Sequence, residues 1–237
     1  MSKLVFIRHA QASYMSDDYD NLSDFGIEQS KSLGRYFNKE GIRFDQVFVG
    51  PLKRHAQTFN HSMEQLPMNN RNEPVFLDGL KEHNGPEALR VKHNEIQDIY
   101  PEVEGWRREM DLDPTLKHRN SLRIFRLFMA DWMDEKIVVD HPDVEPYDQW
   151  KKGVKAAVDT IFQSLQGREN VAVYTSGGTI GSVIGIALGL ENGRTIANLN
   201  DSIRNTSLSH FHYSEQGFNV LSFNEIPHLT KEQITFV

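Results

Sequence analysis

Residues 3–9 read Lys-Leu-Val-Phe-Ile-Arg-His, a mostly apolar run of strand length that ends in a cation and an imidazole. Such a run favours a buried strand, which cannot readily bury Arg8 and His9. Both side chains are therefore expected at the strand's exit, in the crevice beyond the carboxyl edge of an α/β sheet. An arginine fork grips oxyanions through charge-assisted hydrogen bonds, and a neutral histidine can act as nucleophile or base. The pair predicts phosphoryl chemistry.

Two later runs repeat this arrangement of a strand followed by a polar motif. Residues 45–49 precede Gly50-Pro51-Leu52-Lys53-Arg54, and residues 171–174 precede Thr175-Ser176-Gly177-Gly178. A helix is expected after each of the three runs. The helix after residues 3–7 should be capped by Ser23 and run to about Lys39, and the helix after residues 45–49 should hold Pro51 in its first turn. Because strands and helices alternate, the sequence predicts a three-layer α/β/α fold on a mostly parallel sheet, closed by a hairpin over residues 206–213 and 218–224.

The stretch from 86 to about 167 departs from the alternation. It has no strong strand signal apart from residues 137–139, and residues 120–135 and 147–166 are the best helical candidates. It is too long to be a plain crossover between two strands. We therefore expect one domain, residues 1–237, carrying a helical cap insertion that folds over the strand ends.

Composition narrows the function classes. The chain has 237 residues, a net charge of -7 and no cysteine. The charge argues against general nucleic-acid binding, and the missing thiols exclude disulfides, thiolate metal sites and cysteine nucleophiles. No apolar run reaches membrane-spanning length, and a strand begins at residue 3, so we expect no membrane contact, no signal peptide and a cytoplasmic location.

Four motifs in order carry a resemblance to a known family. They are Arg8-His9-Ala10-Gln11; Leu22-Ser23-Asp24-Phe25-Gly26; Pro51-Leu52-Lys53-Arg54-His55-Ala56-Gln57-Thr58; and Leu80-Lys81-Glu82 with the glycine turn at 176–178. Together they resemble the histidine phosphatase superfamily, also called phosphoglycerate-mutase-like. The resemblance covers most of the chain outside the expected cap, and the order of the motifs makes it specific.

The resemblance implies a role for each site residue. His9 would be the nucleophile and become phosphohistidine, while Arg8 and Arg54 would clamp the phosphoryl oxygens. Lys53 competes with Arg54 for that role, and the motif favours Arg54. Glu82 would be the general acid, with His83 beside it.

The remaining positions implied by the resemblance would bind substrate. Gln11, Ser23 and His83 would do so through their side chains, and Ser176 and Gly177 through a turn whose backbone N–H groups face an anion. His55 is assigned a structural role.

Ser176 is the main departure from the family pattern, which has histidine before Gly-Gly. A serine donates one neutral hydrogen bond and supplies no positive charge, and losing such a donor costs on the order of a hundredfold in rate. Two explanations stay open. Another histidine, such as His83, His210 or His212, fills the position, or the site is slowed.

Further departures concern the mutase branch of the family. Ala12 and Met15 stand where mutases carry serine and asparagine, and residues 83–85 lack their arginine and tyrosine. Hydrolysis is therefore favoured over transfer between hydroxyls. Residues 205–207 resemble an asparagine-containing strand that would position the loop after Ser176.

Three other sequence features are interpreted as structural. The tryptophans at 106, 132 and 150 are assigned to the core of the cap. Residues 17–20, Asp-Asp-Tyr-Asp, lack the spacing of a calcium loop and are interpreted as a solvated turn, and no set of histidines has zinc-ligand spacing.

The expected activity is hydrolysis of a phosphomonoester without metal or cofactor, on a phosphorylated small molecule or a phosphoprotein. A catalytically weak phosphate-binding regulator and a phosphoglycerate mutase are the alternatives.

Overall fold

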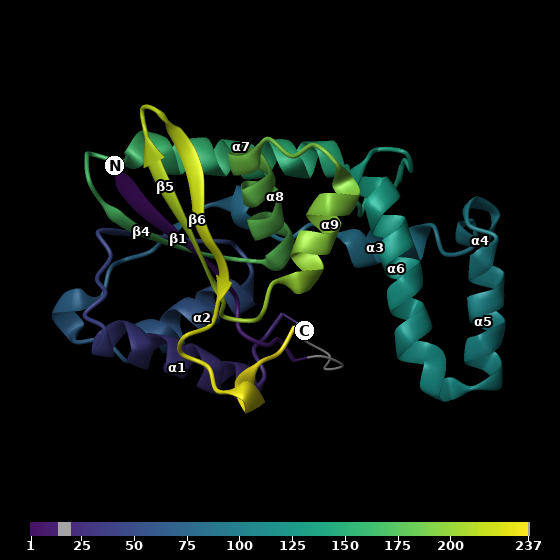
Figure 1. The fold of residues 1–237 in the computed structure, drawn as a ribbon, viewed down its shortest axis with the longest axis horizontal. Helices are drawn as coiled ribbons and strands as arrows, with labels where there is room; N and C mark the ends of the chain where they lie inside the picture. The colour runs from purple at the N-terminus through teal and green to yellow at the C-terminus, as the bar shows by residue number, and fades with distance from the viewer. Residues whose placement is uncertain (14–19, 237) are drawn as a thin grey trace.

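A six-stranded sheet in the order β3-β2-β4-β1-β5-β6 forms the centre of the computed structural model, which describes residues 1–13 and 20–236 (Figure 1). The strands are β1 Ser2–Arg8, β2 Gln46–Val49, β3 Val75–Phe76, β4 Asn170–Thr175, β5 Leu208–Ser214 and β6 Gly217–Glu225. The first four pair in parallel, whereas β5 runs antiparallel to both β1 and β6. The mostly parallel sheet and the terminal hairpin are as the sequence predicts.

Alternation of side chains along β1 divides the core into two layers. Leu4 and Phe6 belong to one cluster of buried residues, and Val5 and Ile7 belong to another. The second cluster includes residues of α1 (Asp24–Lys39) and α2 (Lys53–Met63), and the first includes residues of α7 (Tyr147–Ser164) and α8 (Gly177–Leu188). Since successive side chains of a strand point to opposite faces, one apolar run can serve both layers. The predicted three-layer α/β/α fold is confirmed.

The ends of α1 and α2 agree with the ends predicted from the sequence, except at the start of α2. Ser23 caps α1, with its Oγ accepting from the Gly26 N–H at 3.0 Å, and Gly41 follows the helix with φ +66°. The helix α2 begins at Lys53 with Leu52 as its cap, so Pro51 lies before the first turn rather than in it. The expectation for Pro51 is wrong by two positions.

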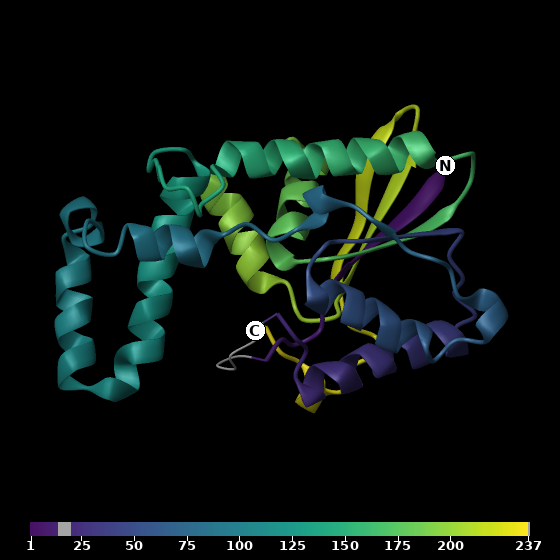
Figure 2. The same ribbon diagram turned by 180° about the vertical axis from the view of Figure 1, so that it is seen from behind.

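Helices fill most of the region between β3 and β4. They are α3 Gly85–Val91, α4 Ile96–Ile99, α5 Glu102–Leu112, α6 Lys117–Met133 and α7. Short 3₁₀ turns cover Asp78–Leu80 and Pro114–Leu116 in this region, and Met68–Asn70 and Lys231–Gln233 elsewhere in the chain. Figures 1 and 2 show α4, α5 and α6 standing away from the sheet to one side, with α9 (Gly193–Ser202) between α6 and the sheet. Closure of this insertion over the strand ends stays a prediction.

Two expectations for the insertion need correction. Residues 137–139 form no strand. The helix α7, which the sequence assigned to the cap, instead lies along the sheet beside α8 (Figure 1) and contributes Val154, Val158 and Ile161 to the main core. A face of α7 that carries apolar residues at helical spacing can bury them only against a sheet or another helix.

Two of the three tryptophans are core residues, as expected. Trp132 and Trp150 are buried, whereas Trp106 is only partly buried. Met15 and residues 17–19 of the expected turn lie outside the described residues. No helix in the described ranges has both the length and the apolar character required to cross a bilayer.

Candidate active site

The topology brings the three polar motifs to one edge of the sheet. The strand β4 lies between β1 and β2 and runs parallel to both, with Arg8 in register with Thr175 and Val49 with Tyr174. Residues that directly follow these strands therefore meet, and the His9 N–H donates to the Thr175 carbonyl at 2.8 Å. This is the edge of the sheet at which the sequence predicts the site.

His9 is held in a single tautomer by its neighbours. Its Nδ1 lies 2.7 Å from the Ala10 carbonyl, which can only accept, and its Nε2 accepts from Arg54 Nε at 3.2 Å. Neutral imidazole has one donor and one acceptor nitrogen, so the proton is on Nδ1 and the Nε2 lone pair faces Arg54. Burial lowers the pKa of His9 well below 6.5, and the charges of Arg54 and Arg8 lower this pKa further. The ring is therefore neutral, and its Nε2 lone pair accepts the hydrogen bond from Arg54.

The backbone around His9 is fixed from two directions. The Asn205 side chain donates to the His9 carbonyl at 3.1 Å. On the other side, the Ala10 N–H donates to Thr58 Oγ1, which donates to the Arg54 carbonyl one turn earlier in α2. Thus Asn205 positions the His9 loop, not the loop after Ser176 as the sequence suggested.

Arg54 contacts an acidic residue as well as His9. Its Nη1 lies 2.7 Å from Asp20 Oδ1, while Asp20 Oδ2 accepts from the Lys53 N–H at 2.8 Å. A carboxylate therefore takes hydrogen bonds from a guanidinium and from the first N–H of α2, as a phosphate would. Asp20 lies in a turn with a partly exposed side chain, as the sequence suggested, but its carboxylate is paired with Arg54 and α2.

Arg8 lies against the glycine turn at the start of α8. Its Nη1 donates to the Ile203 carbonyl. A Cβ placed on Gly177 would lie 3.5 Å from Arg8 Nε and 2.5 Å from Asn200 Oδ1. A larger residue at 177 would require the Asn200 side chain to move. Arg8, Gly177 and the end of α9 are thus close neighbours.

Ser176 is fully buried and hydrogen-bonded to His55. Its Oγ lies 2.6 Å from His55 Nε2, and the rings of His55 and His9 have centroids 5.7 Å apart. Burial lowers the pKa of His55 well below 6.5, and the charge of Arg54 adds to this effect. A neutral imidazole therefore lies directly behind the serine. Histidines 210 and 212 lie on β5 beside Val5 and Lys3, away from the carboxyl end of β1.

The side chain of Glu82 lies against the N-terminus of α8. Its Oε2 accepts from the Gly178 N–H at 3.1 Å and its Oε1 from the His83 N–H at 3.0 Å. A carboxylate interacts favourably with a helix N-terminus. Since Glu82 takes the Gly178 N–H, that group of the expected anion cradle is already occupied.

The segment that carries Glu82 is anchored by three side chains. Thr175 Oγ1 donates to the Leu80 carbonyl, while Thr179 Oγ1 and Trp150 Nε1 both donate to the Lys81 carbonyl. These bonds join the segment to β4, α8 and α7. The position of Glu82 is therefore set by three separate elements.

His83 is buried beside Glu82 with one ring nitrogen unpaired. Its Nδ1 accepts from the Gly85 N–H at 3.2 Å, so Nε2 carries the proton. Nε2 has no hydrogen-bond partner among the described residues and lies 3.5 Å from Glu82 Oε1. The rings of Trp132 and Trp150 flank it edge-on.

Gln11 and Ser23 form a polar pair at the start of α1. Ser23 Oγ donates to Gln11 Oε1 at 2.9 Å while it accepts from the Gly26 N–H. The Gln11 N–H donates to Gln29 Oε1. The Ser23 hydroxyl thus caps α1 and orients Gln11. Within residues 1–13 and 20–236, no three His, Asp or Glu side chains form a group that could hold a metal ion.

Comparison with known families agrees with this arrangement. The family model described as histidine phosphatase superfamily (branch 1) matches residues 4–127 and 108–226, which is most of the chain. The chain belongs to the histidine phosphatase superfamily. As a member, it is similar to proteins described as phosphatases and as mutases.

Two sequence relatives of this histidine phosphatase superfamily member are mutases. A 2,3-bisphosphoglycerate-dependent phosphoglycerate mutase 2 of Latilactobacillus sakei is 39% identical over 70 residues, which cover 27% of this chain and 31% of that protein. The match thus spans about a third of that relative's length. A 2,3-bisphosphoglycerate-dependent phosphoglycerate mutase of Porphyromonas gingivalis is 25% identical over 202 residues, covering 78% of this chain and 77% of that one.

The same fold occurs in a phosphoserine phosphatase of Entamoeba histolytica, solved with phosphoserine. That structure has a TM-score of 0.63 and 17% identity, and covers 97% of this chain and 100% of its own. At this identity the likeness concerns the fold alone.

The structure brings Arg8, His9, Arg54, Ser176, Gly177, Glu82 and His83 to the same edge of the sheet. Sequence reasoning missed Asp20 and Asn200, and it gave His55 no contact with Ser176. His55 directly follows Arg54, so its position in the motif was a usable signal. Asn200 had no signal, because only the packing of α9 brings it to Gly177.

Proposed function

We propose that this histidine phosphatase superfamily member is a phosphomonoester hydrolase that forms a phosphohistidine on His9. The observation that carries the proposal is the state of the imidazole. Its Nδ1 proton is held by the Ala10 carbonyl, its low pKa keeps it neutral, and its Nε2 lone pair lies beside Arg54. Such a nitrogen is prepared to attack phosphorus.

In the first step the Nε2 lone pair attacks phosphorus and the bond to the ester oxygen breaks. Glu82, as general acid, transfers a proton to the leaving oxygen, and Arg8 and Arg54 balance the charge on the phosphoryl oxygens. In the second step a water oxygen attacks the phosphohistidine, the P–N bond breaks and the Glu82 carboxylate takes a proton from the water. Phosphate leaves and neutral His9 is restored.

Substrate binding involves the remaining residues of the site. Ser176 and Gly177 would contact the phosphoryl group, and His83 Nε2–H, unpaired among the described residues, would donate to the substrate near Glu82. Gln11, oriented by Ser23, would contact the substrate at the start of α1.

The test is trapping of the intermediate by an alkaline detergent quench after mixing with a ³²P-labelled phosphomonoester. The label should attach to the protein as an acid-labile, base-stable adduct, with release of inorganic phosphate at steady state. His9→Ala should lose both, whereas His118→Ala, which removes an exposed histidine at the start of α6, should keep both. Label that persists in His9→Ala would overturn the proposal.

Phosphoglycerate mutase activity is a second candidate, favoured by the mutase relative that covers 78% of the chain. The same labelled enzyme tests it. A mutase passes the label from His9 to a hydroxyl of a phosphoglycerate and releases little free phosphate. A hydrolase releases the label as inorganic phosphate.

A further inference from the structure

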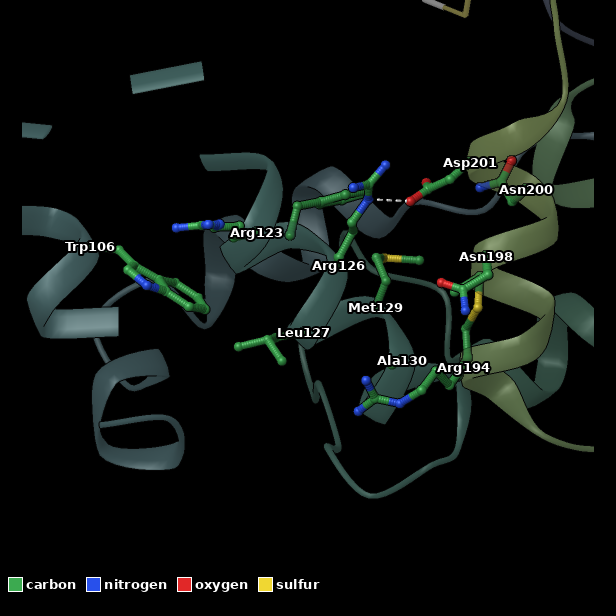
Figure 3. Close-up of a pocket in the computed structure, with 13 residues that line it drawn as sticks. Trp106, Arg123, Arg126, Leu127, Met129, Ala130, Arg194, Asn198, Asn200 and Asp201 are labelled. Atoms are coloured by element: carbon green, nitrogen blue, oxygen red, sulfur yellow. Dashed lines mark hydrogen bonds and ion pairs between the residues drawn. The ribbon is translucent and has the colours of Figure 1, made fainter. Parts of the chain in front are cut away.

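A pocket of about 450 Å³ lies between α6 and α9, with Trp106 of α5 on the far side of α6 (Figure 3). All of its lining residues lie in helices α5, α6 and α9, and those on α6 come from more than one face of that helix. On α6 they include Arg123, Arg126, Ala130 and Met133, and on α9 Arg194, Ala197, Asn198 and Asp201. The pocket therefore belongs to the folded packing of the two helices and not to a loop.

Positive charge dominates the pocket of a chain that is negative as a whole. Among its described lining residues are three arginines, and the only carboxylate is Asp201, which pairs with Arg126 at 2.6 Å. Arg123 lies over the ring of Trp106, 5.7 Å from its centroid. Arg194 makes no hydrogen bond or ion pair within the described residues, although its charge is felt by Asp134, and Figure 3 shows it extending from α9 toward Ala130.

The pocket borders the candidate active site at one end. Asn200 lines the pocket and also lies against Gly177, beside Arg8. Arg8 Nη1 donates to the carbonyl of Ile203, just beyond the end of α9. Arg194 precedes Asn200 by six residues, so it lies roughly 9 Å farther along the helix axis. The Asn200 end of the pocket therefore adjoins Gly177 and Arg8, and the Arg194 end lies farther from them.

We propose that this pocket binds the leaving-group part of the substrate and that this part carries a second anionic group, held by Arg194. The inference rests on the proposed phosphatase function and names its substrate class, small organic phosphomonoesters that carry a second acid group in the leaving-group part. The volume suits a small organic molecule, and Met129, Ala130 and Met133 offer an apolar surface to its carbon skeleton.

The test compares 2-naphthyl phosphate with 6-carboxy-2-naphthyl phosphate. These esters differ in one carboxylate at the end away from the phosphate. The parent protein should have the higher kcat/KM for the carboxylated ester. Arg194→Gln should lower kcat/KM for that ester on the order of tenfold, the loss of one charge-assisted hydrogen bond, and change the neutral ester less than about twofold.

Arg168→Gln is the matched control. It removes an exposed arginine near the start of β4, at the opposite end of the strand from the site, and also without a hydrogen bond or ion pair in the described ranges. It should leave both esters unchanged. Higher ionic strength should reduce the preference for the carboxylated ester in the parent protein, because salt screens exposed charges.

Each contrary outcome has a distinct meaning. Equal kcat/KM for the two esters in the parent, or equal losses in Arg194→Gln and Arg168→Gln, would overturn the inference while leaving the phosphatase function intact. A phosphoserine peptide turned over much faster than either ester would overturn the small-molecule class. Absence of both turnover and phosphohistidine would overturn the proposed function, and this inference with it.

Discussion

Two neighbours set the protonation of His9, the carbonyl of Ala10 and the guanidinium of Arg54. The carbonyl holds a proton on Nδ1, and the cation opposes a second proton on Nε2. Burial contributes more than either charge to the lowered pKa. Reactivity at this residue therefore follows from one backbone contact, one cation and the closure of the core around the ring.

The pKa of His9 gives a testable prediction. An NMR titration of labelled histidines should show His9 neutral well below pH 6.5. Arg54→Gln should move its midpoint upward, because one of the charges that oppose protonation is removed, while burial keeps it below 6.5. Arg43→Gln, which is not among the causes of the shift, should leave it unchanged. A midpoint near 6.5 in the parent protein would contradict this account.

Asp20 competes with anions for Arg54 and the start of α2. Asp20→Asn removes the negative charge and keeps the side-chain shape, so inorganic phosphate should bind about two- to fivefold more tightly. Competitive inhibition by phosphate measures this change. Asp159→Asn, in an exposed pair with Lys155 on α7, should have no effect. Weaker phosphate binding in Asp20→Asn would show that the carboxylate supports the site instead.

The pair of Ser176 and His55 gives a third prediction at this scale. Ser176→His alone should destabilise the protein by about 1–3 kcal/mol, because the new ring would overlap the buried imidazole of His55. Adding His55→Ala should recover part of that loss, so the two changes should be strongly non-additive. Urea unfolding of the parent, the two single variants and the double variant measures this. Additive effects would mean that the two side chains do not share one space.

At the scale of elements, the contact between α1 and α2 depends on a glycine. A Cβ on Gly34 would lie 2.0 Å from the Ser62 carbonyl oxygen, a backbone atom that cannot move independently of α2. The two helices form one wall of the candidate site, since α1 begins beside Gln11 and α2 carries Arg54. Their close approach therefore links packing to the geometry of the site.

Gly34→Ala should destabilise the protein by about 1–3 kcal/mol, because the added methyl group separates the helices. Gly105→Ala is the control, since α5 has nothing within 4 Å of the new methyl group. That change should stabilise the protein by about 0.5–1 kcal/mol through helix propensity. Thermal unfolding of both variants checks the opposite signs, and equal signs would refute the packing argument.

At the scale of the whole molecule, burial lowers the pKa of four histidines, His9, His55, His210 and His228. The pKa values of His9 and His55 lie well below 6.5, and that of His228, which contacts Thr206 Oγ1 at 2.9 Å, is about 4. In the unfolded chain these groups take up protons near pH 6.5, whereas in the folded chain they do so only at lower pH. Protonation below pH 6.5 therefore favours unfolding.

The free energy of unfolding should thus fall between pH 6.5 and about 4, by about 1.4 kcal/mol per pH unit for each such histidine. His228→Asn should reduce the slope of the free energy of unfolding against pH by about 1.4 kcal/mol per pH unit. His118→Asn, at an exposed position, should leave the slope as it is. Denaturant titrations at several pH values give the slopes, and identical slopes in parent and His228→Asn would contradict the assignment.

Much of the fold could be predicted from residues close together in the chain. The apolar run at residues 3–7, the Ser23 cap and the terminal hairpin are local patterns, and local patterns determine strand and helix type. The helix α7 was also predicted, but its partner was not, since an amphipathic face does not specify the surface that covers it. Residues 137–139 show the same limit, because apolar residues form a strand only where a neighbouring strand is available to pair.

The sequence by itself determined that an arginine, a histidine, a second arginine and a serine–glycine turn follow strands, and parallel strands bring such residues to one edge. Only the tertiary structure decided which polar atoms meet there. Asp20 pairs with Arg54, His55 with Ser176, and Asn200 with Gly177 through contacts between distant segments. Such contacts depend on helix packing and register, which form when the whole core closes and leave no periodic signal in the chain.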